Sequence, residues 1–181
     1  MSLPQRKLQR LTNYDYSQCG LYFVTICTFC RQHLFGKIEN GMMVLNDYGI
    51  IAQTHLLYIK EHFPSVEVNP YIIMPNHVHC VVQMAKKNKK ANISSALPDR
   101  IINVKEQLVQ SAERSRPFPT VSTVIGLYKS GVSKQIHEMN PLPSVWQKSF
   151  HDHIIRNEQE YQQIVQYILF NDLNWQDDGL L

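Results

Sequence analysis

Two histidines stand one residue apart in the segment MPNHVHCVV, residues 74–82, at the head of an apolar run. Side chains alternate between the faces of a strand, so His77 and His79 would share one face while Val78 and Cys80 share the other. Imidazoles at positions i and i+2 stand about 6–7 Å apart along a strand. Both can hold one divalent cation, or one can act with water while the other orients it. The same spacing would also occur if the two histidines had no function and simply lay on a half-exposed face. The spacing alone therefore does not choose among these interpretations.

Two other groups of residues have the types needed for metal binding. His151 and His153 form a second His-x-His pair. Cys27 and Cys30 form a C-x-x-C motif, and His33 follows closely. This pattern could supply half of the ligands of a zinc site. Positions three apart on a strand face opposite sides, and the sequence has no second C-x-x-C. We therefore interpret the cysteines as reduced thiols of a cytosolic protein.

Basic residues gather near the first histidine pair. The net charge of +3 says little about nucleic acid, but KKNKK follows directly after the histidine segment. Such a cluster beside a site can hold phosphates, and it is also typical of a solvated loop. The candidate phosphate ligands in this cluster are Lys86, Lys87, Lys89 and Lys90.

The first half of the chain predicts strands around one helix. GLYFVTICT, residues 20–28, is rich in β-branched and aromatic residues and predicts a strand. Residues 34–46 predict a hairpin that turns at Asn40-Gly41. A helix capped by Asn46 or Asp47 should run to Pro64. Residues 66–74 and 77–84 predict two strands that pair antiparallel.

The second half predicts a polar insertion, then helix, strand and helix. Residues of about 85–118 are polar and basic and predict a mobile insertion. A helix should begin at Thr120, because apolar residues recur at spacings of three and four: Val121, Val124, Ile125, Tyr128, Val132 and Ile136. A strand over 149–156 precedes a helix over 157–175 that Asn157 and Glu160 cap.

This order predicts one domain over residues 1–181, an α+β sandwich with helices packed on an antiparallel sheet. No apolar run approaches the roughly 20 residues of a membrane span, and the basic N-terminus lacks the apolar stretch of a secretory signal. We expect a cytoplasmic protein without a membrane partner.

Three segments together resemble one known family. YIIMPNHVHCVV resembles the signature of the single-tyrosine transposases of the HUH endonuclease superfamily, in which two histidines flank a hydrophobic residue. YFVTICTFCRQHLFG looks like the first strand and turn of that family. VWQKSFHDHIIRNEQEYQQIVQYILFNDLNW looks like the C-terminal strand and helix, especially of the REP-associated tyrosine transposases. The resemblance covers most of the chain.

The resemblance implies a ferredoxin-like fold and a specific reaction. His77, His79 and a third polar group would hold Mg²⁺ or Mn²⁺, which polarises a phosphodiester of single-stranded or hairpin DNA. A helical tyrosine would attack phosphorus and form a 5′-phosphotyrosine, freeing a 3′-OH for strand transfer. The resemblance also implies a homodimer.

The resemblance places the attacking tyrosine on the helix VSTVIGLYKSGVSKQIHEMN, whose one tyrosine is Tyr128. Tyr128 also lies on the apolar stripe, as a core aromatic would. Several relatives carry the tyrosine slightly later, where this chain has Gly131, Val132 and Ser133. Gln135 is the expected third metal ligand, with His137 as the alternative.

The remaining residues of the two C-terminal helices take supporting roles in this hypothesis. Lys129 and Lys134 are expected to contact backbone phosphates of the DNA. Tyr161 and Tyr167 are expected to pack in the last helix.

Two rival functions remain open at this point. The first is a catalytically inactive descendant that recognises DNA hairpins. The second is a metal-dependent hydrolase with a water nucleophile, which would turn over without a covalent intermediate. Few carboxylates lie near the histidine pair in sequence, which disfavours the second rival.

Overall fold

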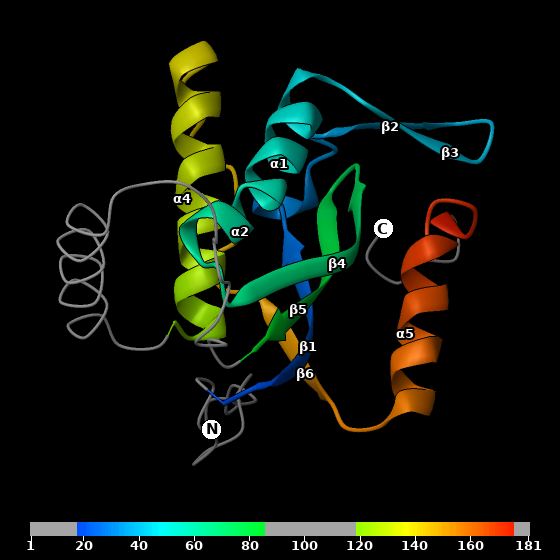
Figure 1. The fold of residues 1–181 in the computed structure, drawn as a ribbon. Coiled ribbons are helices and arrows are strands. Elements are labelled where there is room, and N and C mark those ends of the chain that lie inside the picture. The colour runs from blue at the N-terminus through cyan, green and yellow to red at the C-terminus, as the bar shows by residue number, and fades with distance from the viewer. Residues whose placement is uncertain (1–17, 86–118, 176–181) are drawn as a thin grey trace, which may run out of the picture.

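The computed structural model describes residues 18–85 and 119–175 (Figure 1). The first described range contains β1 (Gly20–Cys27), the 3-10 turn η1 (Phe29–Arg31), β2 (Gly36–Glu39), β3 (Met42–Leu45), α1 (Asp47–Leu57), α2 (Ile59–His62), β4 (Val66–Met74) and β5 (His77–Met84). The second contains α4 (Val121–Met139), β6 (His151–Ile155) and α5 (Glu158–Leu169).

Four strands form one antiparallel sheet in the order β4-β5-β1-β6, and β2 pairs with β3 in a separate hairpin. Helices α1, α2 and α4 lie on one side of the sheet and α5 lies on the other (Figure 1). The predicted α+β architecture, an antiparallel sheet with helices packed on it, is confirmed. In register, Thr25 of β1 pairs with His79 of β5 on one side and with His151 of β6 on the other.

The main core fills the space between the sheet and helices α1 and α4. From the sheet it takes the residues on one set of alternating positions: Tyr22, Val24, Ile26, Val78, Cys80 and Val82. Helix α4 contributes the predicted stripe, Val121, Val124, Ile125, Tyr128, Val132 and Ile136, all buried. Burying one large apolar side chain stabilises a fold by about 1.5–3 kcal/mol, so this layer holds α4 firmly to its side of the sheet.

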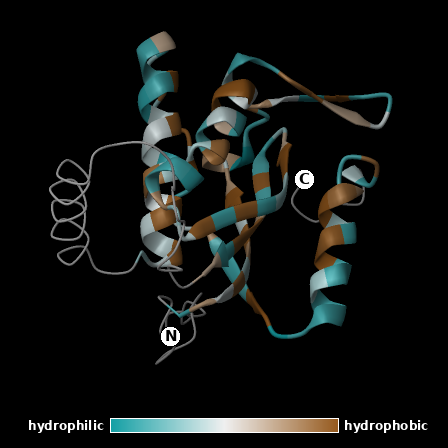
Figure 2. Ribbon diagram, in the orientation of Figure 1, coloured by the Kyte–Doolittle hydropathy of each residue, from teal (hydrophilic) through white to brown (hydrophobic). Residues whose placement is uncertain are grey.

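A smaller core lies under α5, on the opposite side of the sheet. Val81, Ile155 and Ile168 are buried there, with Phe23 and Tyr161 packed against them. Figure 2 shows apolar residues along the sheet strands and on the helices beside them. Successive residues along β1 and β5 therefore pack alternately into two layers, one on each face of the sheet.

Local capping follows the sequence, with two differences in helix length. The Asn46 side chain accepts a hydrogen bond from the Gly49 N–H, as predicted for a helix start. The predicted single helix to Pro64 is two helices, α1 and α2, and Tyr58 is both the C-cap of the first and the N-cap of the second. The predicted last helix ends at Leu169 rather than at residue 175.

Several predictions fall outside the described residues. The insertion predicted at about 85–118, apart from Ala85, and the cluster Lys86, Lys87, Lys89 and Lys90 lie there. Within residues 18–85 and 119–175, no helix combines the length and the apolar character needed to cross a bilayer.

Candidate functional site

The first histidine pair lies on the side of the sheet that α5 covers. Strand residues that pair across an antiparallel sheet share a face, so Thr25 lies on the same face as His79 and Cys27 on the same face as His77. We call this side, which carries Phe23, Thr25, His77 and His79, the histidine face.

The two imidazoles are buried and touch each other. The relative exposure of His77 is 0% and that of His79 is 2%, so they do not form the half-exposed pair that the sequence also allowed. Their ring centroids lie 4.3 Å apart at an interplanar angle of 65°. The turn before the two histidines is fixed by two hydrogen bonds. The Pro75 carbonyl accepts them from the N–H groups of Leu34 and Phe35 at 2.8 and 3.1 Å.

Each imidazole is oriented by a hydrogen bond at Nδ1. His77 Nδ1 lies 2.6 Å from Asn76 Oδ1, an acceptor, so Nδ1 carries the proton and Nε2 carries the lone pair. His79 Nδ1 lies 2.9 Å from Thr25 Oγ1, which can accept its proton in the same way. Histidines that bind a metal through one ring nitrogen commonly have such a hydrogen-bond partner at the other ring nitrogen.

Burial keeps His79 neutral. The pKa of His79 is held well below 6.5, first by burial and then by the neighbouring His77. A neutral imidazole offers a lone pair to a cation or to a proton donor. The pair is therefore suited to coordinate or to accept, and not to supply positive charge by itself.

Two aromatic residues from the C-terminal part complete the histidine face. The Tyr167 hydroxyl of α5 lies 3.2 Å from His79 Nε2. Trp175, six residues beyond the end of α5, stacks on His77 with ring centroids 6.0 Å apart at 23°. Phe23 stacks on His79 at 5.2 Å and meets the Tyr167 ring edge-on at 6.1 Å. Tyr167 is 44% exposed, so solvent reaches its ring beside the buried histidines.

The structure does not bring Tyr128 to the histidine pair. Tyr128 lies on α4, in the core on the other side of the sheet, and is 1% exposed. Its ring packs on Trp146 at 5.6 Å. Burial, and then the nearby Cys80, raises the pKa of Tyr128 well above 10. In the single chain the apolar stripe of α4 packs Tyr128 into the main core, away from the histidines, and its role as nucleophile stays a prediction.

Gln135 is likewise placed away from the histidine pair. It also lies on α4, and its Oε1 is 2.9 Å from Nε2 of His55 on α1. The alternative ligand, His137, is exposed on this helix. In the single chain α4 covers the face opposite the histidines, and the assignment of Gln135 or His137 as third ligand stays a prediction.

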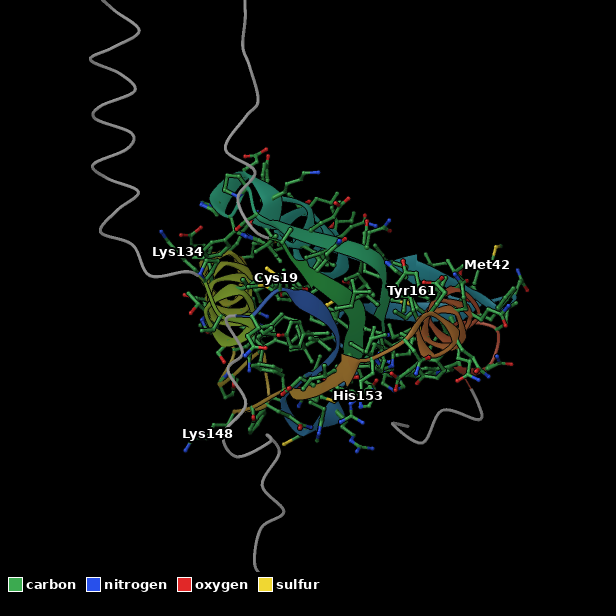
Figure 3. The ribbon with its side chains drawn as sticks, turned by 60° about the horizontal axis from the view of Figure 1, so that its bottom comes forward. Cys19, Met42, Lys134, Lys148, His153 and Tyr161 are labelled. Atoms are coloured by element: carbon green, nitrogen blue, oxygen red, sulfur yellow. The ribbon has the colours of Figure 1, made fainter. Side chains whose placement is uncertain are left out.

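The two described lysines have different surroundings. The Lys129 ammonium donates to the carbonyls of Gln147 and Ser149 at 2.7 and 3.3 Å, and burial lowers its pKa. This lysine ties α4 to the segment before β6. Lys134 is exposed on α4, and Figure 3 shows it on the opposite side of the sheet from Tyr161 of α5. Neither lysine lies on the histidine face.

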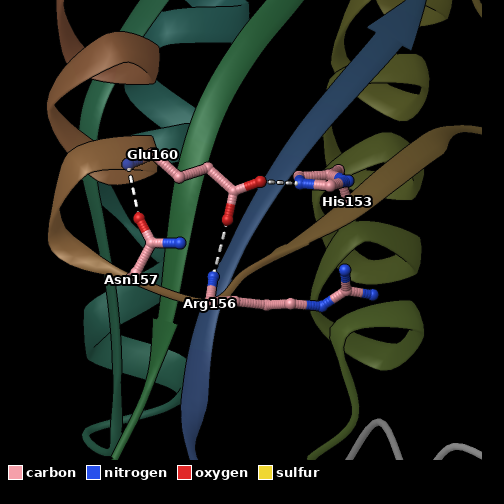
Figure 4. Close-up of polar contacts among 4 residues, drawn as sticks. All are labelled: His153, Arg156, Asn157 and Glu160. Carbon is pink, nitrogen blue, oxygen red and sulfur yellow. Dashed lines mark hydrogen bonds and ion pairs between the residues drawn. The ribbon is translucent and has the colours of Figure 1, made fainter.

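The second His-x-His pair lies on the same face but at its edge. His151 and His153 are exposed on β6, the last strand of the sheet. His153 Nε2 lies 2.6 Å from Glu160 Oε1, and the other oxygen of Glu160 accepts from the Arg156 N–H at 2.7 Å (Figure 4). The Asn157 side chain accepts from the Glu160 N–H at 2.9 Å and caps α5. This cluster joins β6 to the helix that carries Tyr167.

The donor set at the histidine pair fits part of a cation site. Each imidazole has an outer partner at Nδ1, as metal ligands do, but within residues 18–85 and 119–175 no group of three or more His, Cys, Asp or Glu side chains could hold a metal ion. Oxygen ligands for Mg²⁺ or Mn²⁺ would therefore have to come from elsewhere, for example from a phosphate and water.

Sequence reasoning missed Tyr167. The packing interpretation holds for Tyr161, which joins the small core, but Tyr167 points its hydroxyl at His79. Nothing in the spacing along α5 distinguishes these two tyrosines. The distinction needs the position of α5 over the sheet.

Comparison with known proteins places these features in a family. No protein-family model matches the chain. It is 34% identical over 176 residues to an "Uncharacterized protein" of Haemophilus influenzae, covering 97% of this chain and 92% of the relative. It is 24% identical over 164 residues to a "Putative REP-associated tyrosine transposase" of the same organism, covering 89% of this chain and 76% of the relative.

A solved structure has the same fold. It is a REP-associated tyrosine transposase bound to a REP hairpin, and it matches with a TM-score of 0.57 at 17% identity, covering 95% of this chain and 76% of that chain. The chain therefore belongs to the same family as its 34%-identical Haemophilus influenzae relative, and it has the fold of the solved REP-associated tyrosine transposase.

Proposed function

We propose that this protein is a metal-dependent enzyme that nicks single-stranded or hairpin DNA and transfers the strand through a 5′-phosphotyrosine. The observation that carries this proposal is the Tyr167 hydroxyl, 3.2 Å from Nε2 of the buried His79. This contact places a phenol, which can attack phosphorus, beside an imidazole that can bind the cation and that Thr25 orients.

Tyr167 is a better candidate nucleophile than Tyr128 on two physical grounds. A phosphodiester of DNA is bulky and charged, so the attacking residue must lie where a DNA strand can approach it. Tyr167 is 44% exposed, whereas Tyr128 is 1% exposed. Attack is also easier for a phenol that can lose its proton, and burial disfavours the phenolate of Tyr128.

The covalent step balances without an external oxidant or reductant. The Tyr167 oxygen forms a bond to phosphorus, and the bond between phosphorus and the 3′ oxygen breaks. The phenol proton passes to water, and the 3′ oxygen gains a proton as it leaves. The phosphotyrosine keeps the energy of a phosphodiester, so a 3′-OH can attack it in the reverse direction.

His77 and His79 would hold the Mg²⁺ or Mn²⁺ through their Nε2 atoms, with Asn76 and Thr25 as outer partners. When bound, the cation acts as a Lewis acid that stabilises charge on the phosphoryl oxygens. The lone pair of His79 Nε2 serves one partner at a time, because a neutral imidazole has one acceptor nitrogen. Tyr167 therefore has to release His79 when the site is loaded, which frees the phenol for the phosphate.

Covalent attachment to DNA tests the proposal. A labelled hairpin oligonucleotide with single-stranded flanks is incubated with the protein and Mn²⁺, and denaturing gels are searched for an adduct that mass spectrometry maps to one residue. Tyr167→Phe should abolish the adduct. Tyr161→Phe is the matched control, because it removes a phenol from the same helix without touching His79.

The outcomes separate the rival functions. An adduct that survives in Tyr167→Phe contradicts the assignment of the nucleophile. Binding without any adduct in the presence of Mn²⁺ supports the inactive hairpin-binding descendant. Strand cleavage without an adduct supports a hydrolase with a water nucleophile. The homodimer implied by the family resemblance stays a prediction, which sedimentation of the full chain tests.

A further inference from the structure

A cavity adjoins the histidine face near Pro75 and Trp175. It has a volume of about 380 Å³ and lies between the β2–β3 hairpin and the segment after α5. This volume falls within the range of small-molecule sites, about 300–1,000 Å³. Its walls include the aromatic Trp175, the apolar Ile38 and Leu173, and the charged Lys37 and Asp172.

Trp175 joins this cavity to the histidine pair. The same indole that lines the cavity stacks on His77 at 6.0 Å and meets His33 edge-on at 5.5 Å. Pro75, whose carbonyl anchors the turn before His77, also lines the cavity. A molecule in the cavity would therefore contact the same indole that stacks on His77.

Two charged side chains line the cavity, Asp172 and Lys37. Asp172 Oδ1 accepts from the Leu173 N–H at 3.0 Å and Oδ2 accepts from the Met43 N–H at 3.4 Å, which holds the carboxylate still. Two carboxylate oxygens have about four lone-pair sites, so Asp172 can accept further hydrogen bonds from an amino group. The Lys37 ammonium lies 2.6 Å from Glu39 Oε1 on an exposed strand, so it can exchange that partner for a phosphate.

We propose that this cavity receives one unstacked base of the single strand whose neighbouring phosphate lies at His77 and His79. The base stacks on Trp175, its amino group donates to Asp172, and Lys37 contacts the backbone. Aromatic stacking accepts any base, whereas a fixed carboxylate favours cytosine, adenine or guanine over thymine, which has no exocyclic amino group. This inference rests on the proposed function, because it takes the strand at the histidine pair to be DNA.

Tryptophan fluorescence tests the cavity without requiring cleavage. The chain has two tryptophans, and Trp146 is 6% exposed in the main core, so quenching by a stacked base reports on Trp175. Four-nucleotide strands of dC and dT are titrated into Tyr167→Phe protein in EDTA. We expect saturable quenching by dC at lower concentration than by dT, and loss of the quenching in Trp175→Phe.

Two lysine variants supply a matched comparison. Lys37→Ala and Lys60→Ala each remove an exposed lysine with a glutamate partner, Glu39 and Glu67, but Lys60 lies on α2 away from the cavity. Lys37→Ala should weaken binding several-fold and reduce its salt dependence, whereas Lys60→Ala should do neither. Trp175→Ala lacks the reporting indole, so its binding is followed by the anisotropy of a fluorescently labelled strand, and it should be about tenfold weaker.

Three results would overturn the inference: no quenching by either strand, quenching that persists in Trp175→Phe, or equal effects of the two lysine variants. Asp172→Asn adds a test of base preference and should reduce the advantage of dC over dT. Failure of the proposed function is distinguishable from failure of this inference. If the strands quench the fluorescence but the unaltered protein forms no adduct, the proposed enzymatic function is contradicted and the base site stands. If the unaltered protein forms an adduct but the strands do not quench the fluorescence, the base site is contradicted and the enzymatic function stands.

Discussion

Removing the hydroxyl of Tyr128 is expected to stabilise the protein and to leave DNA attachment intact. The hydroxyl is buried and has no hydrogen-bond partner among the described residues. A buried polar group without a partner costs about 1–3 kcal/mol, which Tyr128→Phe recovers. The void left by one oxygen offsets part of this gain. We therefore expect a net stabilisation of about 1 kcal/mol, a rise in Tm of about 2–4 °C.

Tyr22→Phe is the matched control for this prediction. Tyr22 is also fully buried in the main core, but its hydroxyl donates to the Gln18 carbonyl at 3.1 Å. Its loss should cost about 0.5–1.5 kcal/mol, so the two Tyr→Phe changes are expected to have opposite signs. Urea unfolding measures both, and an unchanged m-value shows that the shift in midpoint is a change in stability.

The same two variants are then tested for covalent attachment to DNA. Tyr128→Phe should form the adduct at the rate of the unaltered protein. The reasoning is refuted if Tyr128→Phe destabilises the protein as much as Tyr22→Phe does, since the buried hydroxyl then has a partner. It is also refuted if a stably folded Tyr128→Phe protein no longer attaches, because the core tyrosine would then be the nucleophile.

Three further predictions concern α5 and the histidine pair. Asn157→Ala removes the cap that accepts from the Glu160 N–H, so it should cost about 1 kcal/mol and loosen α5, which thermal unfolding and a slower adduct rate would report. Asn76→Ala and Thr25→Val each remove an outer partner of an imidazole and should weaken Mn²⁺ binding about 10–100-fold, measured by calorimetry; unchanged affinity would contradict the ligand assignment. Because the pKa of His79 is held well below 6.5, the unfolded chain gains a proton as pH falls below that value while the folded chain does not. Stability in EDTA should therefore be constant above pH 6.5 as far as His79 is concerned, and should fall by up to about 1.4 kcal/mol per pH unit below it. A His79→Gln variant with an unchanged slope would show that another group is responsible.

Local structure followed from the sequence where short-range physics decides it. Alternation along residues 77–84 placed His77 and His79 on one face of a strand, because successive side chains of a strand point to opposite sides. The apolar stripe of residues 121–136 predicted α4, and Asn46 and Asn157 predicted two helix starts, since a cap bonds only to the next turn. These features depend on residues at most a few positions apart.

The sequence could not say which helix covers which face of the sheet. Both α4 and α5 carry tyrosines at positions compatible with packing, and the family resemblance favoured Tyr128. The choice depends on contacts between elements far apart in the chain: Tyr128 packs on Trp146 in the main core, whereas Tyr167 reaches His79 across 88 positions of sequence.

Residue types and spacing thus determined the antiparallel α+β design, the paired imidazoles and the helix that buries Tyr128. Only the tertiary structure decided that the imidazoles are buried under α5 and that the Tyr167 hydroxyl contacts His79. It also decided that Trp175 contacts His77 and lines the neighbouring cavity. The physical reason is that a periodic pattern says which side of an element is buried but not against what. Which element packs against that side depends on how all layers of the fold pack together. The energy of this packing comes from contacts between distant segments and cannot be assigned to one local stretch of the chain.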